Sequence, residues 1–205
     1  MTLFSCRINK IPQMQKSEPI RAVLSPGPRL AVGRACEVAA LVLTQPKKAS
    51  QLIECLWDED PGIANRAADA LERASYHRPT LAAPWKDSLL GLLAEAGQNK
   101  LRWNLALIVP RLQLTPPECR RAAATLRTYL DDKSSIVKTC AMQGLAELTR
   151  HDPSLLPEIL DLLRILARSG TPAMRARGRI LLAKLEAPVP SLAQFRKSAL
   201  RNQGG

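Results

Sequence analysis

The chain has 205 residues and a formal net charge of +12, with 30 Lys and Arg against 18 Asp and Glu. Its length suits one domain that can bury a core without disulfides or metal, and no stretch of 18 uncharged apolar residues predicts a membrane span. Aromatic residues make up only 3% of the chain, so Leu, Ala, Ile and Val must build the core, which favours packed helices over a sheet.

The first segment, residues 1–30, contains four prolines and shows no clear helical period. We predict a flexible or extended N-terminal arm there. Residues 31–187 follow, in which apolar residues recur at i, i+3, i+4 and i+7 between short turns, and this pattern predicts helices. The predicted helices span 31–44, 48–57, 61–75, 84–96, 99–113, 116–131, 134–150, 153–168 and 172–186. A last helix is predicted over 190–202, in a basic C-terminal segment of residues 188–205.

Several helix boundaries carry capping signals. Thr115 is followed three residues later by Glu118, which is the pattern of a capping box. Asp60 and Thr171 each precede a proline that suits the first position of a helix. Pro110 lies inside a predicted helix and should kink it.

Four of the predicted helices can be aligned without gaps. Their leading apolar residues are Ile63, Leu101, Val137 and Met174, which are 38, 36 and 37 residues apart. Apolar or small residues follow at positions four, seven, eight and eleven of each copy. The residues at position eight are Leu71, Val109, Leu145 and Leu182. We expect all four of these to be buried, because repeated copies of one template are typical of a helical solenoid.

The register resembles that of the HEAT repeat family. Each repeat of that family pairs a helix A with a helix B, with an aspartate in the turn and a basic residue near the start of helix B. Asp58 and Asp132 occupy the turn position here, and Arg102, Lys138 and Arg175 follow the leading apolar residues. The resemblance implies that these basic residues pair with the turn aspartates of adjacent repeats; the alternative is that they form a ligand-binding stripe.

The resemblance covers about residues 48–187. It implies an all-α, right-handed α-solenoid of about four HEAT-like helical hairpins, with extra capping helices at each end. Such repeats usually serve as binding scaffolds. We therefore expect a non-enzymatic interaction module that binds a protein or peptide partner, possibly an acidic one, in a concave groove lined by the B helices.

Trp103 and Leu107 lie one turn apart on the second B helix, off its core stripe. An exposed Trp–Leu pair in the groove would suit a binding hot spot. The alternative is that both side chains contact the neighbouring A helix or the N-terminal arm.

Positive charge is concentrated near the C-terminus, where residues 164–205 hold nine basic residues against one acidic residue. Such a concentration attracts phosphate backbones or acidic protein surfaces, although a solvated face would look the same. The alternative function is nucleic-acid binding, and it would use backbone contacts because Phe195 is the only aromatic residue in this region. The candidate binding residues there are Arg164, Arg168, Arg175, Arg177 and Arg179.

A DNA glycosylase built on HEAT-like repeats is a third and more distant alternative, suggested by the size, the charge and Trp103. Such enzymes place an acid one turn after a tryptophan, beside the flipped nucleotide, and that place is Leu107 here. The five cysteines are widely spaced, and the two histidines form no cluster with them. We therefore predict a cytoplasmic protein without enzymatic activity, metal or cofactor, and without membrane attachment. Its oligomeric state stays open.

Overall fold

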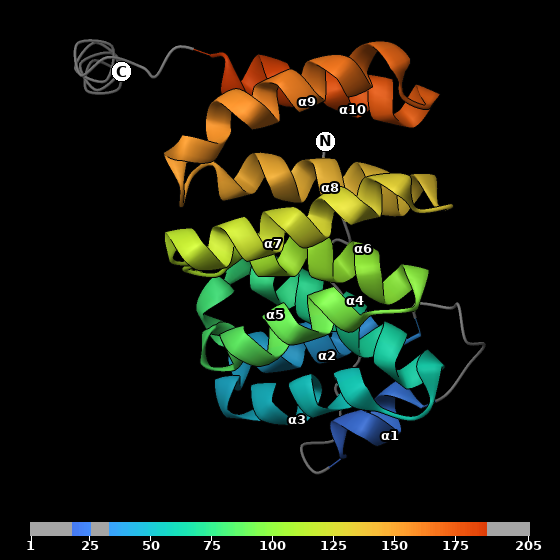
Figure 1. Cartoon of the computed structure of the whole chain (residues 1–205). Coiled ribbons are helices and arrows are strands. Elements are labelled where there is room, and N and C mark those ends of the chain that lie inside the picture. Colours follow the sequence, from blue (N-terminus) through green and yellow to red (C-terminus); the bar gives the residue numbers. More distant parts are fainter. Residues whose placement is uncertain (1–17, 26–32, 188–205) are drawn as a thin grey trace, which may run out of the picture.

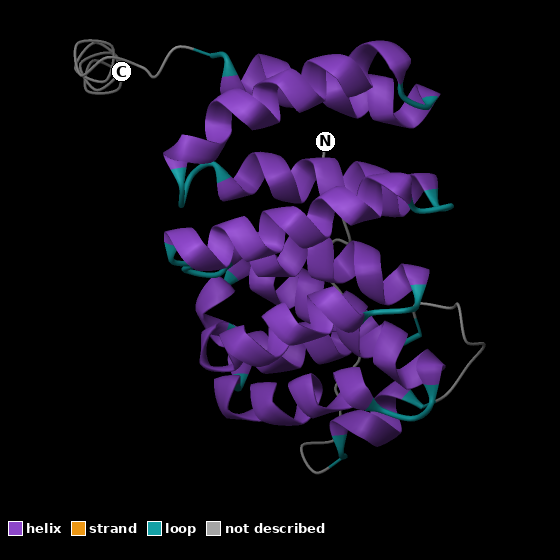
Figure 2. Cartoon of the chain, in the orientation of Figure 1, coloured by secondary structure: helices purple, strands orange, loops and turns teal. Residues whose placement is uncertain are grey.

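The structure is a computed structural model that describes residues 18–25 and 33–187. The described residues form helices joined by short turns and contain no strand, as Figure 2 shows. One set of helices, the B layer, consists of α2 (Ala35–Thr44), α4 (Pro61–His77), α6 (Asn99–Ile108), α8 (Ser135–Leu148) and α10 (Pro172–Leu185). The other set, the A layer, consists of α3 (Ala49–Glu54), α5 (Lys86–Glu95), α7 (Pro116–Thr128) and α9 (Leu156–Ser169). The chain is an α-solenoid.

The two layers arise from repeated helical hairpins. Helices α3, α5, α7 and α9 each contact the B helix that follows them, and each B helix contacts the next one along the stack. Figure 1 shows the hairpins stacked in sequence order, with α9 and α10 at one end and α1 and α3 at the other. The predicted pairs of helices are therefore confirmed over the described residues.

The aligned register is confirmed in its core positions. The leading residues Ile63, Leu101, Val137 and Met174 are all buried. At position eight, Leu71, Val109 and Leu145 are also buried, but Leu182 is only half-buried. The expectation was wrong for Leu182 because α10 is the last described helix, and no described repeat packs beyond it.

Part of the segment predicted as a flexible arm packs against the solenoid. The short helix α1 (Ile20–Leu24) contacts α2, α3 and α4, and its Ile20, Val23 and Leu24 are buried. Arg66 of α4, only 1% exposed, donates hydrogen bonds to the carbonyls of Leu24 and Ser25 at the end of α1. The rest of the predicted arm, and the helix predicted over 190–202, lie outside the described residues.

The predicted caps are present. The Asp60 carboxylate accepts a hydrogen bond from the Gly62 N–H at 2.7 Å, and the Thr115 N–H donates to Glu118 Oε2 at 2.7 Å. At Pro110 the chain does not kink and continue as predicted. Instead α6 ends at Ile108, and the next three residues form a 3-10 turn, because proline has no N–H for the α-helical ladder.

Candidate functional site

The turn aspartates act as structural residues. Asp132 is buried, accepts a hydrogen bond from the Ser134 N–H at 2.7 Å and pairs with Arg102 of the preceding repeat at 2.7 Å. Burial acts to raise the pKa of Asp132, but these two donors together hold it below its usual range. The ladder pairing is thus confirmed for Arg102. It is not repeated by Arg175, which donates to the Gly170 carbonyl at 3.2 Å.

The other turn aspartate has a different partner. Asp58 accepts a hydrogen bond from the Asp60 N–H at 3.0 Å, as Asp132 does from Ser134. Its ion-pair partner, however, is Arg21 of α1, at 2.6 Å. The hydrogen bond from Arg21 lowers the pKa of Asp58. Helix α1 therefore supplies the arginine that a preceding repeat would supply.

A second feature is the surface formed by positions two and six of the B helices, which we call the B face. The B-face residues are Asn65 and Asp69 in α4, Trp103 and Leu107 in α6, Thr139 and Gln143 in α8, and Ala176 and Ile180 in α10. Asn65 and Asp69 are 2% and 6% exposed, the residues in α6 and α8 are half-buried, and Ile180 is 60% exposed. The B-face side chains are therefore buried at α4 and become progressively more exposed toward α10.

Trp103 and Leu107 have an intermediate position. Both are half-buried and pack against the hydrophobic core. They are less exposed than the hot-spot hypothesis expected, and they are not enclosed by their own repeat. The exposed part of each side chain belongs to the B face.

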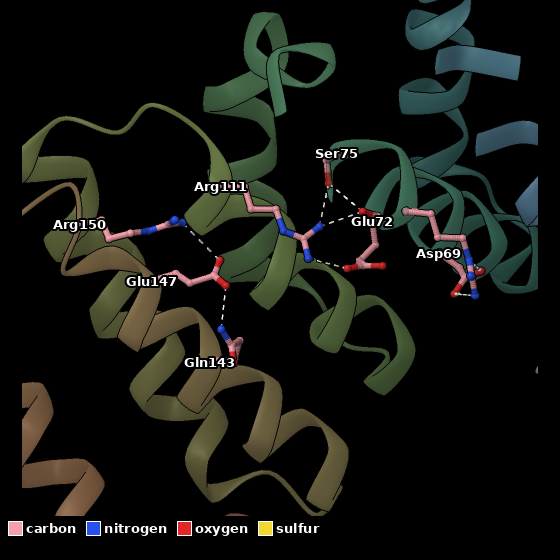
Figure 3. Close-up of polar contacts among 8 residues, drawn as sticks. Asp69, Glu72, Ser75, Arg111, Gln143, Glu147 and Arg150 are labelled. Atoms are coloured by element: carbon pink, nitrogen blue, oxygen red, sulfur yellow. Dashed lines mark hydrogen bonds and ion pairs between the residues drawn. The ribbon is translucent and has the colours of Figure 1, made fainter. Parts of the chain in front are cut away.

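Polar side chains on and beside the B face form ion pairs and hydrogen bonds within and between repeats (Figure 3). Arg111 Nη2 lies 2.6 Å from Glu72 Oε1, and Arg111 Nη1 donates to the Glu72 carbonyl at 2.8 Å. In the next repeat, Gln143 Nε2 donates to Glu147 Oε1 at 2.7 Å. Gln143 Oε1 accepts from Arg177 Nη1 at 3.5 Å, which links α8 to α10. Acidic and basic groups are thus paired along this surface.

Sequence reasoning did not single out this polar row. Its members Glu72, Arg111 and Glu147 occupy positions nine and ten of the aligned register; Glu72 and Glu147 lie in α4 and α8, and Arg111 lies in the 3-10 turn after α6. Opposite charges at neighbouring positions in successive copies were the signal that could have identified it. Only the structure gives the pairing.

The five arginines predicted near the C-terminus do not form one group. Arg177 is half-buried and faces Gln143 of α8. Arg164 is paired with Asp161 at 2.8 Å and with Glu186 at 2.7 Å. The other three of these five arginines are exposed and have no acidic partner among the described residues. They are Arg168, Arg175 and Arg179.

Buried cysteines and a histidine lie in structural surroundings. Burial raises the pKa of Cys55 to about 11 and that of Cys140 to about 12, so both thiols stay protonated at neutral pH and are poor nucleophiles. His151 Nε2 lies 3.0 Å from the Pro110 carbonyl oxygen, a contact that joins two repeats. Over residues 18–25 and 33–187, no group of three or more His, Cys, Asp or Glu could hold a metal ion. In the same residues, no helix is long and apolar enough to cross a membrane.

Comparison with known proteins supports the architecture. A solved structure of a designed armadillo repeat protein, YIII(Dq)4CqI, superposes with a TM-score of 0.53 at 16% sequence identity, covering 82% of this chain and 81% of that one. No protein-family model matches the chain, and no curated protein matches it. The likeness establishes an α-solenoid fold and leaves the HEAT assignment to the sequence register.

Proposed function

We propose that this chain is a HEAT-like, non-enzymatic scaffold of the cytoplasm that binds a protein or peptide on the B face of α6, α8 and α10. One observation carries the proposal: equivalent positions open from a buried pair in α4 to the 60% exposed Ile180 in α10. Ile180, Leu107 and Trp103 place apolar surface within this open part. Repeat solenoids use such extended surfaces for binding.

The charges beside the B face favour a protein over a nucleic acid there. The carboxylate of Glu72 is paired with Arg111, and that of Glu147 accepts from Gln143. Because Arg111 is already paired with Glu72, this row offers a phosphate backbone little free positive charge, whereas a protein partner can place apolar groups at the centre and polar groups at the edge. The B face is therefore suited to a mixed, partly apolar ligand.

The test compares two isoleucines of the same hairpin. Ile180 of α10 and Ile165 of α9 are both 60% exposed, but they belong to opposite layers. Wild-type chain, Ile180→Asp and Ile165→Asp are used as bait for affinity capture from lysate, with and without nuclease. We expect a nuclease-resistant protein partner that the wild type and Ile165→Asp retain and that Ile180→Asp loses by tenfold or more, the size of a hot-spot effect.

Two outcomes contradict the proposal. If Ile165→Asp loses the partner and Ile180→Asp keeps it, the binding surface is on the A layer. If nuclease removes every captured protein from the wild type, the captured material is held through nucleic acid. Thermal unfolding of each variant, followed by circular dichroism, checks that neither exposed substitution disturbs the fold.

A further inference from the structure

The last hairpin presents a second charged surface, formed by one stripe of each of its helices. On α10 and its C-cap residue the stripe is Arg175, Arg179, Leu182 and Glu186, at i, i+4, i+7 and i+11. On α9 it is Asp161, Arg164 and Arg168, at i, i+3 and i+7. Residues with these spacings share one side of a helix. The ion pair of Arg164 with Glu186, at 2.7 Å, joins the two stripes into a single surface.

The charges on this surface are separated into two parts. Asp161 and Glu186 both bind Arg164 and neutralise the part distant from the α9–α10 turn. The part near the turn carries Arg168, Arg175 and Arg179, all exposed. Helix α10 contains no Asp or Glu between its first and last residues. We call Arg168, Arg175 and Arg179 the arginine face.

The spacing of the arginine face suits a row of anionic groups. Arg175 and Arg179 are one helical turn apart, which is about 6 Å along the axis. Arg168 stands on the neighbouring helix, and packed helix axes lie about 8–10 Å apart. Guanidinium groups bind phosphate oxygens through two parallel hydrogen bonds. Three such groups, on successive turns of one helix and on its packed neighbour, can therefore contact neighbouring phosphates.

We propose that the arginine face binds the phosphate backbone of duplex nucleic acid, without reading its sequence. Helices α9 and α10 contain no aromatic residue, so unpaired bases would find no stacking partner there, which favours a duplex over a single strand. The stripe of α10 contains one apolar residue, the half-buried Leu182, so this stripe lacks the apolar centre of a typical protein interface. This surface is distinct from the B face, because Ile180 lies off the stripe that contains Arg179.

The experiment measures binding of fluorescent duplex DNA to the full chain by anisotropy, between about 50 and 200 mM salt. The test variant is Arg168→Gln, Arg175→Gln and Arg179→Gln combined. Its matched control replaces three exposed basic residues elsewhere, Lys47, Arg78 and Arg121, by Gln, which gives the same net charge.

The wild type should bind with a steep salt dependence. Three lost phosphate contacts should flatten the slope of log K against log salt by about 2.7 in the test variant. Between the two salt concentrations, the test variant should therefore lose about 40-fold less affinity than the wild type loses. The control should change the slope by less than one unit, and Ile180→Ser, which alters the B face without adding a charge, should bind the duplex as the wild type does.

Three results would overturn the proposal. One is absence of duplex binding by the wild type at the lowest salt. The second is an equal change of slope in the test and control variants, which would mean that net charge alone drives binding. The third is displacement of the duplex by poly-glutamate at equal charge concentration, which would assign the arginine face to an acidic protein. None of these results depends on whether the B face binds a protein.

Discussion

Gly144 offers a sharp test of how closely the B helices pack. It lies in α8, and a Cβ atom added to it would overlap the backbone carbonyl oxygen of Ala106 in α6 and lie 3.0 Å from Leu126 Cδ1. The carbonyl belongs to a helix backbone, so α6 and α8 must separate to admit a methyl group. We therefore expect Gly144→Ala to destabilise the fold, although alanine is the better helix former.

The magnitude follows from two opposing effects. Replacing glycine by alanine inside a helix normally stabilises by about 0.5–1 kcal/mol. Overpacking of a filled core costs about 1–3 kcal/mol, and a backbone obstacle places this site in the upper part of that range. The net expectation is a loss of about 2 kcal/mol in the free energy of unfolding.

Gly91 provides the matched control. It lies inside α5, and a Cβ atom there would meet nothing within 4 Å. Gly91→Ala should therefore gain about 0.5–1 kcal/mol from helix propensity alone. Urea denaturation followed by circular dichroism measures both variants. A stabilising effect of Gly144→Ala, equal to that of Gly91→Ala, would refute the close approach of α6 and α8.

Two further predictions concern a cap and the B face. The hydrogen bonds to Glu118, first from Lys86 and then from the Thr115 N–H, lower its pKa from 4.5 to about 2. Their stabilisation is present above the unfolded pKa and is lost as pH falls through the folded one, so urea midpoints of Glu118→Gln should fall less than those of the wild type between about pH 5 and pH 2. Trp103→Ala should lower the free energy of unfolding, measured by thermal unfolding, by about 2 kcal/mol. This lies between the small cost at an exposed site and the roughly 3–5 kcal/mol at a buried aromatic site. The same change should weaken partner capture. The same change at Trp57, which is 48% exposed, should leave both nearly unchanged.

Much of the fold could be predicted because a solenoid is built from local patterns. Leu71, Val109 and Leu145 are buried at equivalent places because each closes the same hairpin against the same neighbours. Sequence spacing alone identifies such positions, since the contacts of each repeat are with adjacent repeats only. Leu182 departs from the pattern because a core position needs a neighbouring helix on both sides, and no described helix packs beyond α10.

Helix α1 could not be predicted in the same way. It is five residues long, which is too short for a helical period to be recognised. Its position depends on Arg66, whose guanidinium binds two carbonyls at the end of α1. Arg66 lies 42 residues away from Leu24, and nothing in the spacing of either segment encodes that contact. The long-range contact is a tertiary one, and it closes the N-terminal end of the described solenoid.

The candidate surfaces were only partly predictable, because equivalent positions in a repeat need not have equivalent surroundings. Asp69, Leu107 and Ile180 share position six of the register, yet their exposure rises from 6% to 60% along the stack. Exposure depends on which elements cover each B helix, and the aligned template contains no such information. The arginines of α10 separate for the same reason: Arg177 is turned toward α8, whereas Arg179 lies on the stripe with Arg175 and Glu186. Because successive residues of a helix point in different directions, the arginines of α10 lie on two different surfaces. Each surface can be tested without disturbing the other.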